Sequence, residues 1–300
     1  MREPLELVPR GPFSLRAAAE FGFGPNEGRP PAFDGAMRLA FALDGGRGYA
    51  GAVLGQEQTD GPVHVELQTA GGGDPGRATE QLARILSLDH DGEAFIEVGE
   101  RDLVLGALQR THPGQRPVLF HSPYEGAAWS IISNRRRSSQ AARVRAALSE
   151  RLGARFELAG MTLHAFPQPE QLLGLELGDV SGLEQERLAR LRGVAEAALA
   201  GKHDPEHLHQ LGPERAYQEI QALKGIGPFY AGLIVLRASG FADAMLEVAE
   251  PKVLAHAARL YEIEEPVTVE RFRELAERWR PFRTWATVLI RLAGDRGTSV

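Results

Sequence analysis

Apolar and polar positions alternate along the first hundred residues in the manner of β-strands. The alternation is clearest over residues 37–43, 49–54 and 63–67, and glycine- and proline-rich stretches separate these runs. An apolar stripe with helical spacing follows over 77–88, and a shorter helix is expected after Glu100. The pattern predicts a meandering antiparallel sheet domain over residues 1–110, with helices that cover one of its sides.

The period of the pattern changes to 3.6 residues beyond Pro123. Apolar stripes with this period occupy residues 124–133, 138–152, 184–200, 213–223, 228–239, 251–262, 269–279 and 284–293. We therefore predict an α+β protein, in which an all-helical domain over residues 111–295 follows the sheet domain. Residues 154–182 contain three short apolar runs and predict no definite element, and residues 296–300 are expected to be a frayed tail.

Composition removes several classes of site. The chain has no cysteine, which excludes disulfides, iron–sulfur clusters and cysteine-ligated zinc. His203, His207 and His209 crowd one stretch, but beside Asp204-Pro205 they are better explained as the polar start of a helix, so no catalytic metal is expected. No apolar run approaches the roughly 18 residues of a membrane helix, and we expect a cytoplasmic protein without a membrane partner.

The charge is unevenly distributed along the chain. The formal net charge of −6 argues mildly against nucleic-acid binding. However, residues 134–155 hold a single acid, Glu150, and seven arginines, which are Arg135, Arg136, Arg137, Arg143, Arg145, Arg151 and Arg155. This arginine segment is either a solvated helix face or a surface for phosphate groups.

A glycine hairpin between two helices is the most informative local pattern. Residues 216–223 are helix-like, Gly225-Ile226-Gly227 cannot continue the helix, and Pro228 is suited to open a second one. Glycines allow a backbone to press against a phosphate, and the N–H groups of the second helix's first turn then face the anion. The alternative is a helical hairpin that binds no ligand.

The neighbourhood of this hairpin resembles a known family. The series Leu223-Lys224-Gly225-Ile226-Gly227-Pro228-Phe229, then Leu236-Arg237, Asp243 and residues 279–286, resembles the helix-hairpin-helix DNA glycosylase superfamily, most closely its bacterial inducible 3-methyladenine glycosylase branch. The resemblance covers nearly the whole chain and is strongest over 213–243 and 277–290. It implies a protein that binds damaged double-stranded DNA and rotates the target nucleotide into a cleft. We expect such a protein to be a monomer that is associated with the nucleoid. No cofactor is implied beyond a monovalent cation that some members bind at the hairpin.

The resemblance also assigns candidate contact residues. It implies that the hairpin residues Lys224, Gly225, Ile226 and Gly227 bind a phosphate beside the lesion, and it makes Lys224 and Arg283 candidates for either phosphate binding or packing. An alkylated base is a cation, which aromatic faces attract. The candidates for such faces are Trp129, Phe229 and Trp285, with Tyr230 and Phe282 nearby, and each can equally be a core residue.

The sequence departs from the family at the catalytic acid. The family's aspartate lies about two dozen residues beyond the hairpin, where an ungapped alignment places Ala249. With one inserted residue Glu250 takes that place, and Glu247 is the alternative. A carboxylate is needed there because breaking the N-glycosidic bond develops positive charge on the sugar. Glu250 precedes Pro251, so it can also be a helix N-cap.

Two further departures concern the reaction and the DNA contact. The family's lyases carry a nucleophilic lysine where this chain has Phe229, so we expect simple hydrolysis without lyase activity. Asn134 and Arg135 replace the family's glutamine and apolar wedge, and Arg136 follows them. Arg135 can fill the vacated base stack or contact a phosphate.

Three hypotheses follow. The first is a monofunctional glycosylase for alkylated bases of the 3-methyladenine type. The second is a non-catalytic DNA-lesion or DNA-structure binding protein that kept the fold, as the replacement at Ala249 allows. The third is a helical scaffold whose hairpin meets protein, which only the acidic total charge supports.

Overall fold

The computed structural model describes residues 5–21, 33–263 and 266–298. Its main sheet is antiparallel, with strand order β1–β4–β3–β2. The strands are β1 (Leu5–Leu7), β2 (Ala36–Ala42), β3 (Tyr49–Gly55) and β4 (Val63–Ala70). In the register, Phe41 lies opposite Ala50 and Leu54 opposite Val65. The antiparallel sheet predicted from alternation is confirmed, and β1 is an addition to it.

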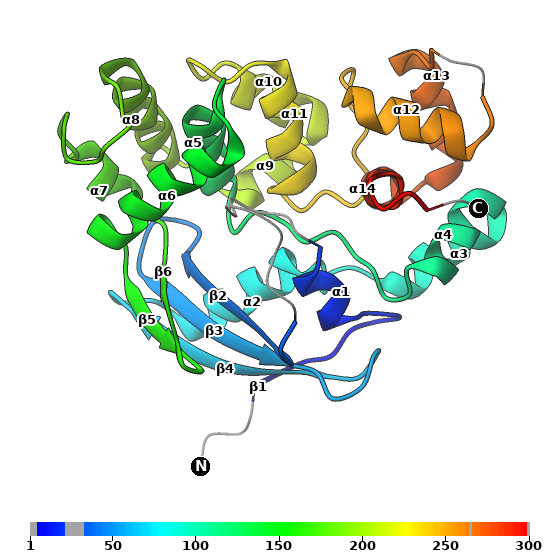
Figure 1. The fold of residues 1–300 in the computed structure, drawn as a ribbon, viewed down its shortest axis with the longest axis horizontal. Coiled ribbons are helices and arrows are strands. Elements are labelled where there is room, and N and C mark those ends of the chain that lie inside the picture. The colour runs from blue at the N-terminus through cyan, green and yellow to red at the C-terminus, as the bar shows by residue number, and fades with distance from the viewer. Residues whose placement is uncertain (1–4, 22–32, 264–265, 299–300) are drawn as a thin grey trace.

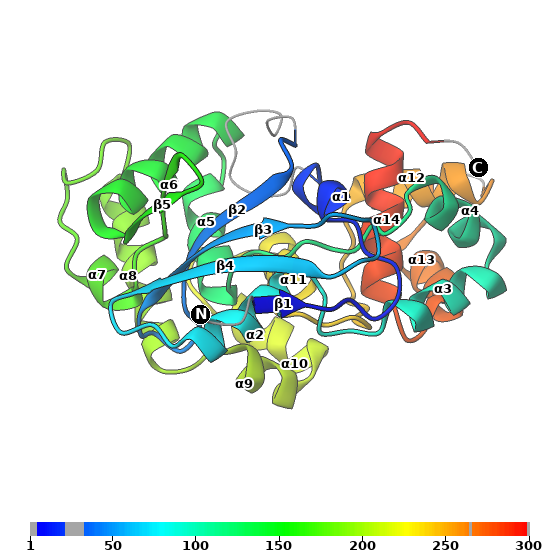
Figure 2. The ribbon, with the colours of Figure 1, turned by 90° about the horizontal axis from the view of Figure 1, so that it is seen from below.

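One face of the sheet is covered by helices. The helices α1 (Leu15–Ala19) and α2 (Pro75–Ile85) contribute to a cluster with the inward-facing strand residues, in which Leu82 and Ile85 join Phe41 and Leu54 with no exposed surface. Figure 2 shows the strands crossing in front of the helical layer. The helix expected over 77–88 is therefore present and begins two residues earlier.

A short hairpin that the sequence did not predict covers the opposite face. Strands β5 (Arg155–Leu158) and β6 (Met161–His164) pair with each other, and Phe156 packs with Ala40, Ala42 and Tyr49. Gly51 permits this contact, because a Cβ there would lie 2.5 Å from the Phe156 ring. The hairpin falls within the indefinite stretch 154–182.

The remaining helices form a row beside the sheet (Figure 1). They are α3 (Gly92–Arg101), α4 (Leu103–Thr111), α5 (Pro123–Ser133), α6 (Ser138–Leu152), α7 (Pro169–Leu173), α8 (Gln185–Leu199), α9 (Pro205–Leu211), α10 (Pro213–Gln221), α11 (Pro228–Arg237), α12 (Pro251–Leu260), α13 (Val269–Ala276), the 3-10 turn η1 (Glu277–Trp279) and α14 (Arg283–Asp295). All eight predicted apolar stripes lie on helices, and α9 begins at Pro205, where the polar histidine stretch indicated a helix start. Neither α3 nor α7 was predicted.

The helices divide into two hydrophobic clusters. One is built mainly from α5 to α11, and the other joins α3 and α4 to the C-terminal helices α12 to α14. For example, Phe95 and Leu105 pack in the same cluster as Trp279 and Ile290. Packing therefore crosses the boundary that the sequence placed near residue 110, and that boundary stays a prediction.

Arg84 of α2 connects the turn after β2 to the segment before α5 and to the end of α11. Its guanidinium pairs with Asp44 in the turn after β2 at 2.6 Å, and it donates to the carbonyls of His121 and Ala238 at 2.8 and 2.7 Å. Ala238 directly follows α11, so this arginine fixes the end of that helix against the sheet.

The chain end is held in place as far as it is described. Residues 296–298 donate backbone hydrogen bonds to α14, and the carbonyl of Thr298 accepts from Arg259 at 2.9 Å. The prediction of a frayed tail is wrong for these residues, and the last two lie outside the described ranges. Within those ranges, no helix has both the length and the apolar character that a membrane crossing needs.

Candidate DNA interface and base pocket

The glycine hairpin lies between α10 and α11 and is anchored from inside. The Ile226 N–H donates to the carbonyl of Leu223 at 3.1 Å, and the Ile226 side chain is buried in the helical cluster. Gly225 has φ +97°, and a Cβ there would lie 2.6 Å from Cδ of Arg190 on α8. Both the backbone and the close approach of α8 therefore require glycine at this position.

Gly227 differs from Gly225, because the protein itself does not need a glycine there. It is the N-cap residue of α11 with φ −85° and ψ 175°, and a Cβ would meet no heavy atom of the described residues within 4 Å. The N–H groups of a helix's first turn have no partner within the helix. At Gly227 they are approachable from solvent, and the exposed Lys224 stands beside them in the hairpin.

The turn between α5 and α6 lies next to the hairpin. The hydroxyls of Ser133 and Tyr230 are 3.1 Å apart, which joins the end of α5 to the start of α11. On the other side, Arg187 of α8 donates to the carbonyl of Asn134 at 2.7 Å. Arg135 follows at the exposed tip with φ +55°. The structure thus places Asn134 and Arg135 beside the hairpin.

The arginine segment is less positive than its sequence indicates, because four of its members pair with acids. These ion pairs are Arg136–Glu184, Arg145–Glu125, Arg151–Asp179 and Arg155–Glu157. Arg136 is largely buried and also donates to the carbonyl of Gly182, so its expected DNA contact is corrected to an intramolecular one. Arg135 and Arg137 are exposed and have no ion pair with the residues that the structure describes.

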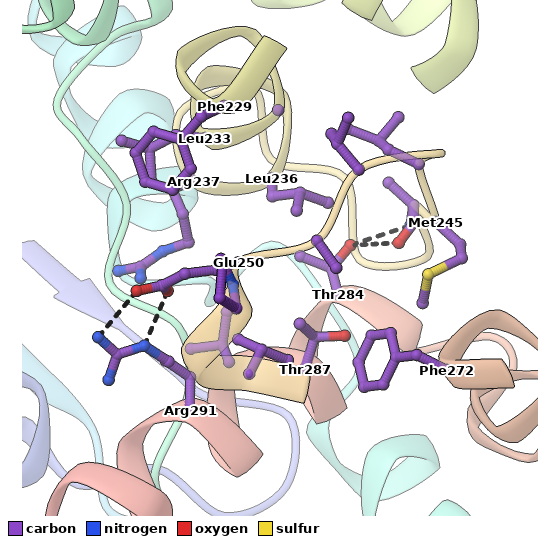
Figure 3. Close-up of a pocket in the computed structure, with 18 residues that line it drawn as sticks. Phe229, Leu233, Leu236, Arg237, Met245, Glu250, Phe272, Thr284, Thr287 and Arg291 are labelled. Atoms are coloured by element: carbon purple, nitrogen blue, oxygen red, sulfur yellow. Dashed lines mark hydrogen bonds and ion pairs between the residues drawn. The ribbon is translucent and has the colours of Figure 1, made fainter. Parts of the chain in front are cut away.

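A pocket of about 300 Å³ lies behind the hairpin, with α11 as one wall (Figure 3). The opposite walls come from the loop before α12, from Phe272 of α13 and from α14. Most lining side chains are aliphatic, and they include Leu233, Leu236, Met245, Val248 and Val288. Phe229 also lines the pocket and is half exposed. Because α11 starts at the hairpin, one helix joins the anion-facing backbone to this pocket.

Glu250 is the carboxylate of this pocket. Its backbone caps α12, but its side chain makes no capping hydrogen bond. Instead its two oxygens accept from Nε and Nη2 of Arg291 at 2.7 and 3.1 Å, as the dashed lines in Figure 3 show. About a third of the Glu250 side chain remains exposed. The role as a helix N-cap therefore explains the backbone position of Glu250, but it does not explain where its carboxylate is placed.

Arg291 and Arg237 line the pocket close to Glu250, and neither was assigned to the site from the sequence. Burial disfavours the charge on Arg291, but the hydrogen bonds that it donates to Glu250 and Asp295, together with their negative charges, outweigh burial and raise the pKa of Arg291. Arg237 of α11 also lines the pocket, where burial and the charge of Arg291 lower its pKa to about 9, against the opposing effect of Glu250. Both guanidinium groups are therefore charged at neutral pH.

Several other candidates lie away from the pocket. Glu247 is 89% exposed and its nearest ion-pair partner is Arg273 at 3.9 Å, so it faces solvent. Trp285 is buried between Phe95 and Phe282 and is a core residue, which corrects its assignment to the base pocket.

Trp129 and Arg283 also make contacts within the protein and do not line the pocket. Trp129 is half-buried against the cluster of α5 to α11 and does not belong to the described pocket lining, contrary to expectation. Arg283 pairs with Asp243 at 2.7 Å and with Glu277 at 2.8 Å, so the structure supports packing and not phosphate binding among its two proposed roles.

Comparison with known proteins agrees with this arrangement. The chain is 30% identical over 268 residues to a probable bifunctional transcriptional activator/DNA repair enzyme AlkA of Mycobacterium tuberculosis, a match that covers 85% of this chain and 49% of that protein. A DNA-3-methyladenine glycosylase of Bacillus subtilis is 22% identical over 206 residues, which are 68% of this chain and 67% of that one. The chain thus spans about half the length of the mycobacterial relative. No family model matches.

A solved structure shows that the fold is shared along the chain. The 3-methyladenine DNA-glycosylase from Archaeoglobus fulgidus superposes with a TM-score of 0.73 at 24% identity, over 99% of this chain and all of that one. This likeness shows that the chain has the fold of that glycosylase.

Proposed function

We propose that this protein is a monofunctional DNA glycosylase, which hydrolyses the N-glycosidic bond of alkylated bases, including those of the 3-methyladenine type, in duplex DNA. The observation that carries the proposal is that Glu250 lines a base-sized pocket whose wall is the helix that begins at the glycine hairpin. The relatives are named for DNA repair and for 3-methyladenine removal, which supports the same activity.

The DNA contact follows from the positions of the backbone and the free cations. A phosphate at Gly227 would accept from the N–H groups that open α11, and Lys224 would neutralise it. Arg135, at the neighbouring tip, would enter the duplex where the flipped nucleotide leaves the stack. A monovalent cation would bind carbonyl oxygens of the same hairpin, since backbone carbonyls are suitable hard ligands. One protein monomer supplies all of these contacts.

Glu250 would supply the charge that the reaction needs. As the bond between C1′ and the base nitrogen lengthens, the sugar becomes an oxocarbenium ion, and an adjacent carboxylate stabilises it or orients the attacking water. Arg291 holds both carboxylate oxygens, so the side chain is fixed before the nucleotide arrives. A fixed charge requires no reorganisation during the reaction.

The first test is release of free base from a methylated duplex in single turnovers. Glu250→Gln keeps the size of the side chain and removes the anion, so the rate should fall by about 10²–10⁴ while DNA affinity stays the same. Glu247→Gln is the matched control and should keep the wild-type rate, because Glu247 is exposed outside the pocket. A wild-type rate for Glu250→Gln would remove Glu250 from the chemistry.

The same reactions test hydrolysis against lyase chemistry. Phe229 offers no amine where the lyases have lysine, so borohydride should trap no covalent adduct and strand cleavage should need added alkali. A trapped adduct would reveal an amine nucleophile elsewhere. If the wild-type protein binds lesion duplex but releases no base from any substrate, it is a lesion-binding protein and the glycosylase proposal fails.

A further inference from the structure

A second cavity lies where the sheet meets the helical layer, and it shares no lining residue with the pocket of Glu250. Its volume is about 440 Å³. Its walls come from the turn after β2, from the first turn of α2, from the segments that lead into α5 and α7, and from the turn between α8 and α9. Cavities of this size at a junction between parts of a fold are suited to small molecules.

His203, in the turn between α8 and α9, is the most unusual residue of the cavity wall. Its side chain is 3% exposed, and neither ring nitrogen has a hydrogen-bond partner among the described residues. Burial and the charge of Lys202 lower its pKa to about 4, so at neutral pH the ring has one N–H donor and one acceptor nitrogen. A buried polar group without a partner costs free energy and is rare in native proteins. A ligand in this cavity would supply the missing partner.

The rest of the interior combines neutral hydrogen-bonding groups with apolar surface. Ser122, the N-cap of α5, is almost fully buried and accepts from the N–H of Glu125 at 3.0 Å, and its own O–H donates to none of the described residues. Leu43 and Leu199 contribute aliphatic surface to the same lining. This interior suits a flat, uncharged ring that carries hydrogen-bonding edges, as a nucleobase does.

Free charges stand at the exposed rim of the cavity. Arg47 and Arg77 are exposed rim residues, and neither forms an ion pair with any part of the chain that the structure describes. Glu170 is an exposed acid of the same rim and has no such ion pair either. Two arginines against one glutamate leave an excess of positive charge, which favours an anionic group at the rim.

The other two acids of the lining are engaged within the protein. Asp44 pairs with Arg84 at 2.6 Å. Asp204 caps α9, where it accepts from the N–H of Glu206 at 2.8 Å and faces the positive end of the helix. The charges that remain for a ligand are therefore those of the rim.

We propose that this cavity binds a nucleoside monophosphate, with its base inside against His203 and its phosphate at the two rim arginines, Arg47 and Arg77. The cavity is remote from the proposed DNA contact. The helix α5 begins at the cavity and ends at Ser133, whose hydroxyl meets that of Tyr230 beside the hairpin. Its length of about 16 Å separates the two sites. The nucleotide should therefore bind whether or not DNA is present, and whether or not the protein releases bases.

The first test is calorimetric titration of the full-length protein with adenosine 5′-monophosphate. Adenosine lacks the phosphate and ribose 5-phosphate lacks the base, so each should bind at least about tenfold more weakly than the nucleotide. Ribose 5-phosphate binding as tightly as the nucleotide would show an anion site without base recognition. No binding of the nucleotide up to about 10 mM would refute the proposal.

Replacement of His203 separates a ligand-binding role from a structural one. His203→Leu removes both ring nitrogens and should weaken nucleotide binding about tenfold, the usual effect of one lost hydrogen bond. Its midpoint of denaturant unfolding should stay the same or rise, because an apolar side chain replaces an unpartnered polar one. His207→Leu is the control, since His207 pairs with Glu219 outside the cavity. Wild-type nucleotide affinity in His203→Leu would contradict the assignment.

Charge substitutions at the rim decide even if His203→Leu does not fold. Arg77→Gln and Arg47→Gln should weaken binding of the nucleotide and leave binding of adenosine unchanged. Glu170→Gln should tighten binding of the nucleotide, because it removes the opposing charge. Arg110→Gln, on the exposed surface of α4, is the control and should change neither. Unchanged nucleotide affinity in all three rim variants would place the phosphate elsewhere.

A competition experiment distinguishes this cavity from the pocket of Glu250, which could also admit a base. A saturating undamaged duplex should leave nucleotide affinity unchanged, and the nucleotide should not displace the duplex. Mutual displacement would place the nucleotide in the DNA interface or in the pocket of Glu250 and would overturn the proposal. These binding measurements need no base release, so their outcome is independent of the proposed glycosylase activity.

Discussion

Arg135 holds a left-handed backbone conformation at the tip of the turn between α5 and α6. Such a conformation costs a residue with a side chain roughly 1–2 kcal/mol, and an exposed turn gives no packing in return. Strain of this kind often marks a functional position. The neighbouring contact between Ser133 and Tyr230 fixes the turn against the start of α11, so Arg135 points outward from a rigid support beside the hairpin.

We expect Arg135→Ala to weaken binding to lesion duplex more than binding to undamaged duplex. An arginine that fills a vacated stack acts only where a nucleotide has been rotated out, whereas a phosphate contact acts on any duplex. Arg137→Ala removes an exposed arginine two residues away and is the matched control. Titrations of both duplexes at several salt concentrations measure the difference. Equal losses on the two duplexes, with a salt slope lowered by about one, would assign Arg135 to a phosphate.

At the scale of elements, the two glycines of the hairpin have separate roles. The fold itself requires a glycine at position 225, because the φ of +97° and the nearby side chain of Arg190 exclude a Cβ. Gly227 has an ordinary extended backbone and open space where a Cβ would stand. A glycine that the fold does not need, at the start of a helix with an uncovered first turn, fits a requirement that comes from a ligand.

Alanine substitutions should separate these two roles. Gly225→Ala should lower the free energy of unfolding by about 1–3 kcal/mol, through strain and the clash with Arg190. Gly227→Ala should leave unfolding unchanged and weaken binding to every duplex, because its methyl group occupies the path of the phosphate. Chemical denaturation and DNA titration of both variants measure the two effects. Full DNA affinity in a stably folded Gly227→Ala variant would place the phosphate elsewhere.

The sequence predicted the elements with long apolar stripes and missed those that depend on distant partners. Helices such as α6 and α8 can be predicted from the sequence because their apolar residues repeat with the helical period over fifteen positions. The β5–β6 hairpin has four-residue strands, and Phe156 packs onto Gly51, which is about a hundred positions away in the chain. No local pattern near Phe156 indicates that contact.

The site shows the same division between local and distant information. The hairpin was predicted residue by residue, because its glycines and Pro228 act on neighbouring backbone. Arg291 was missed because only the tertiary fold brings it to Glu250 across 41 positions. Trp285 was misplaced because an aromatic residue on a helix can face a core or a cleft, and here the packing of Phe95 and Phe282 selects the core.

At the scale of the whole molecule, Glu125 joins the sheet to the helical layer. It lies in the first turn of α5, buried, and pairs with Arg145 of α6 and with His121, whose ring is 5.8 Å from that of Phe41 in β2. Arg145 in turn stands over the Phe166 ring at 5.7 Å. A buried ion pair that loses one partner is strongly destabilising, so this group links the ionisation of one carboxylate to the stability of the entire fold.

Acid unfolding should depend on Glu125. Burial would raise its pKa, but the charges and hydrogen bonds of Arg145 and His121 outweigh burial and lower the pKa from 4.5 to about 2. A carboxylate with a lowered pKa stabilises the fold above its unfolded pKa and loses this contribution as the pH falls through the folded one. Between about pH 5 and pH 2, the wild-type protein should therefore lose on the order of 3 kcal/mol through this group.

Glu125→Gln should remove that part of the pH dependence. The variant should be less stable than wild type by about 3–5 kcal/mol at pH 7, because Arg145 keeps a buried charge without its partner, and the two proteins should converge as the pH approaches 2. Glu186→Gln is the control, since Glu186 is a largely exposed carboxylate that also pairs with an arginine and should change stability little. Denaturant unfolding at a series of pH values measures all three proteins. A constant difference between wild type and Glu125→Gln across this range would show that the lowered pKa of Glu125 does not stabilise the fold.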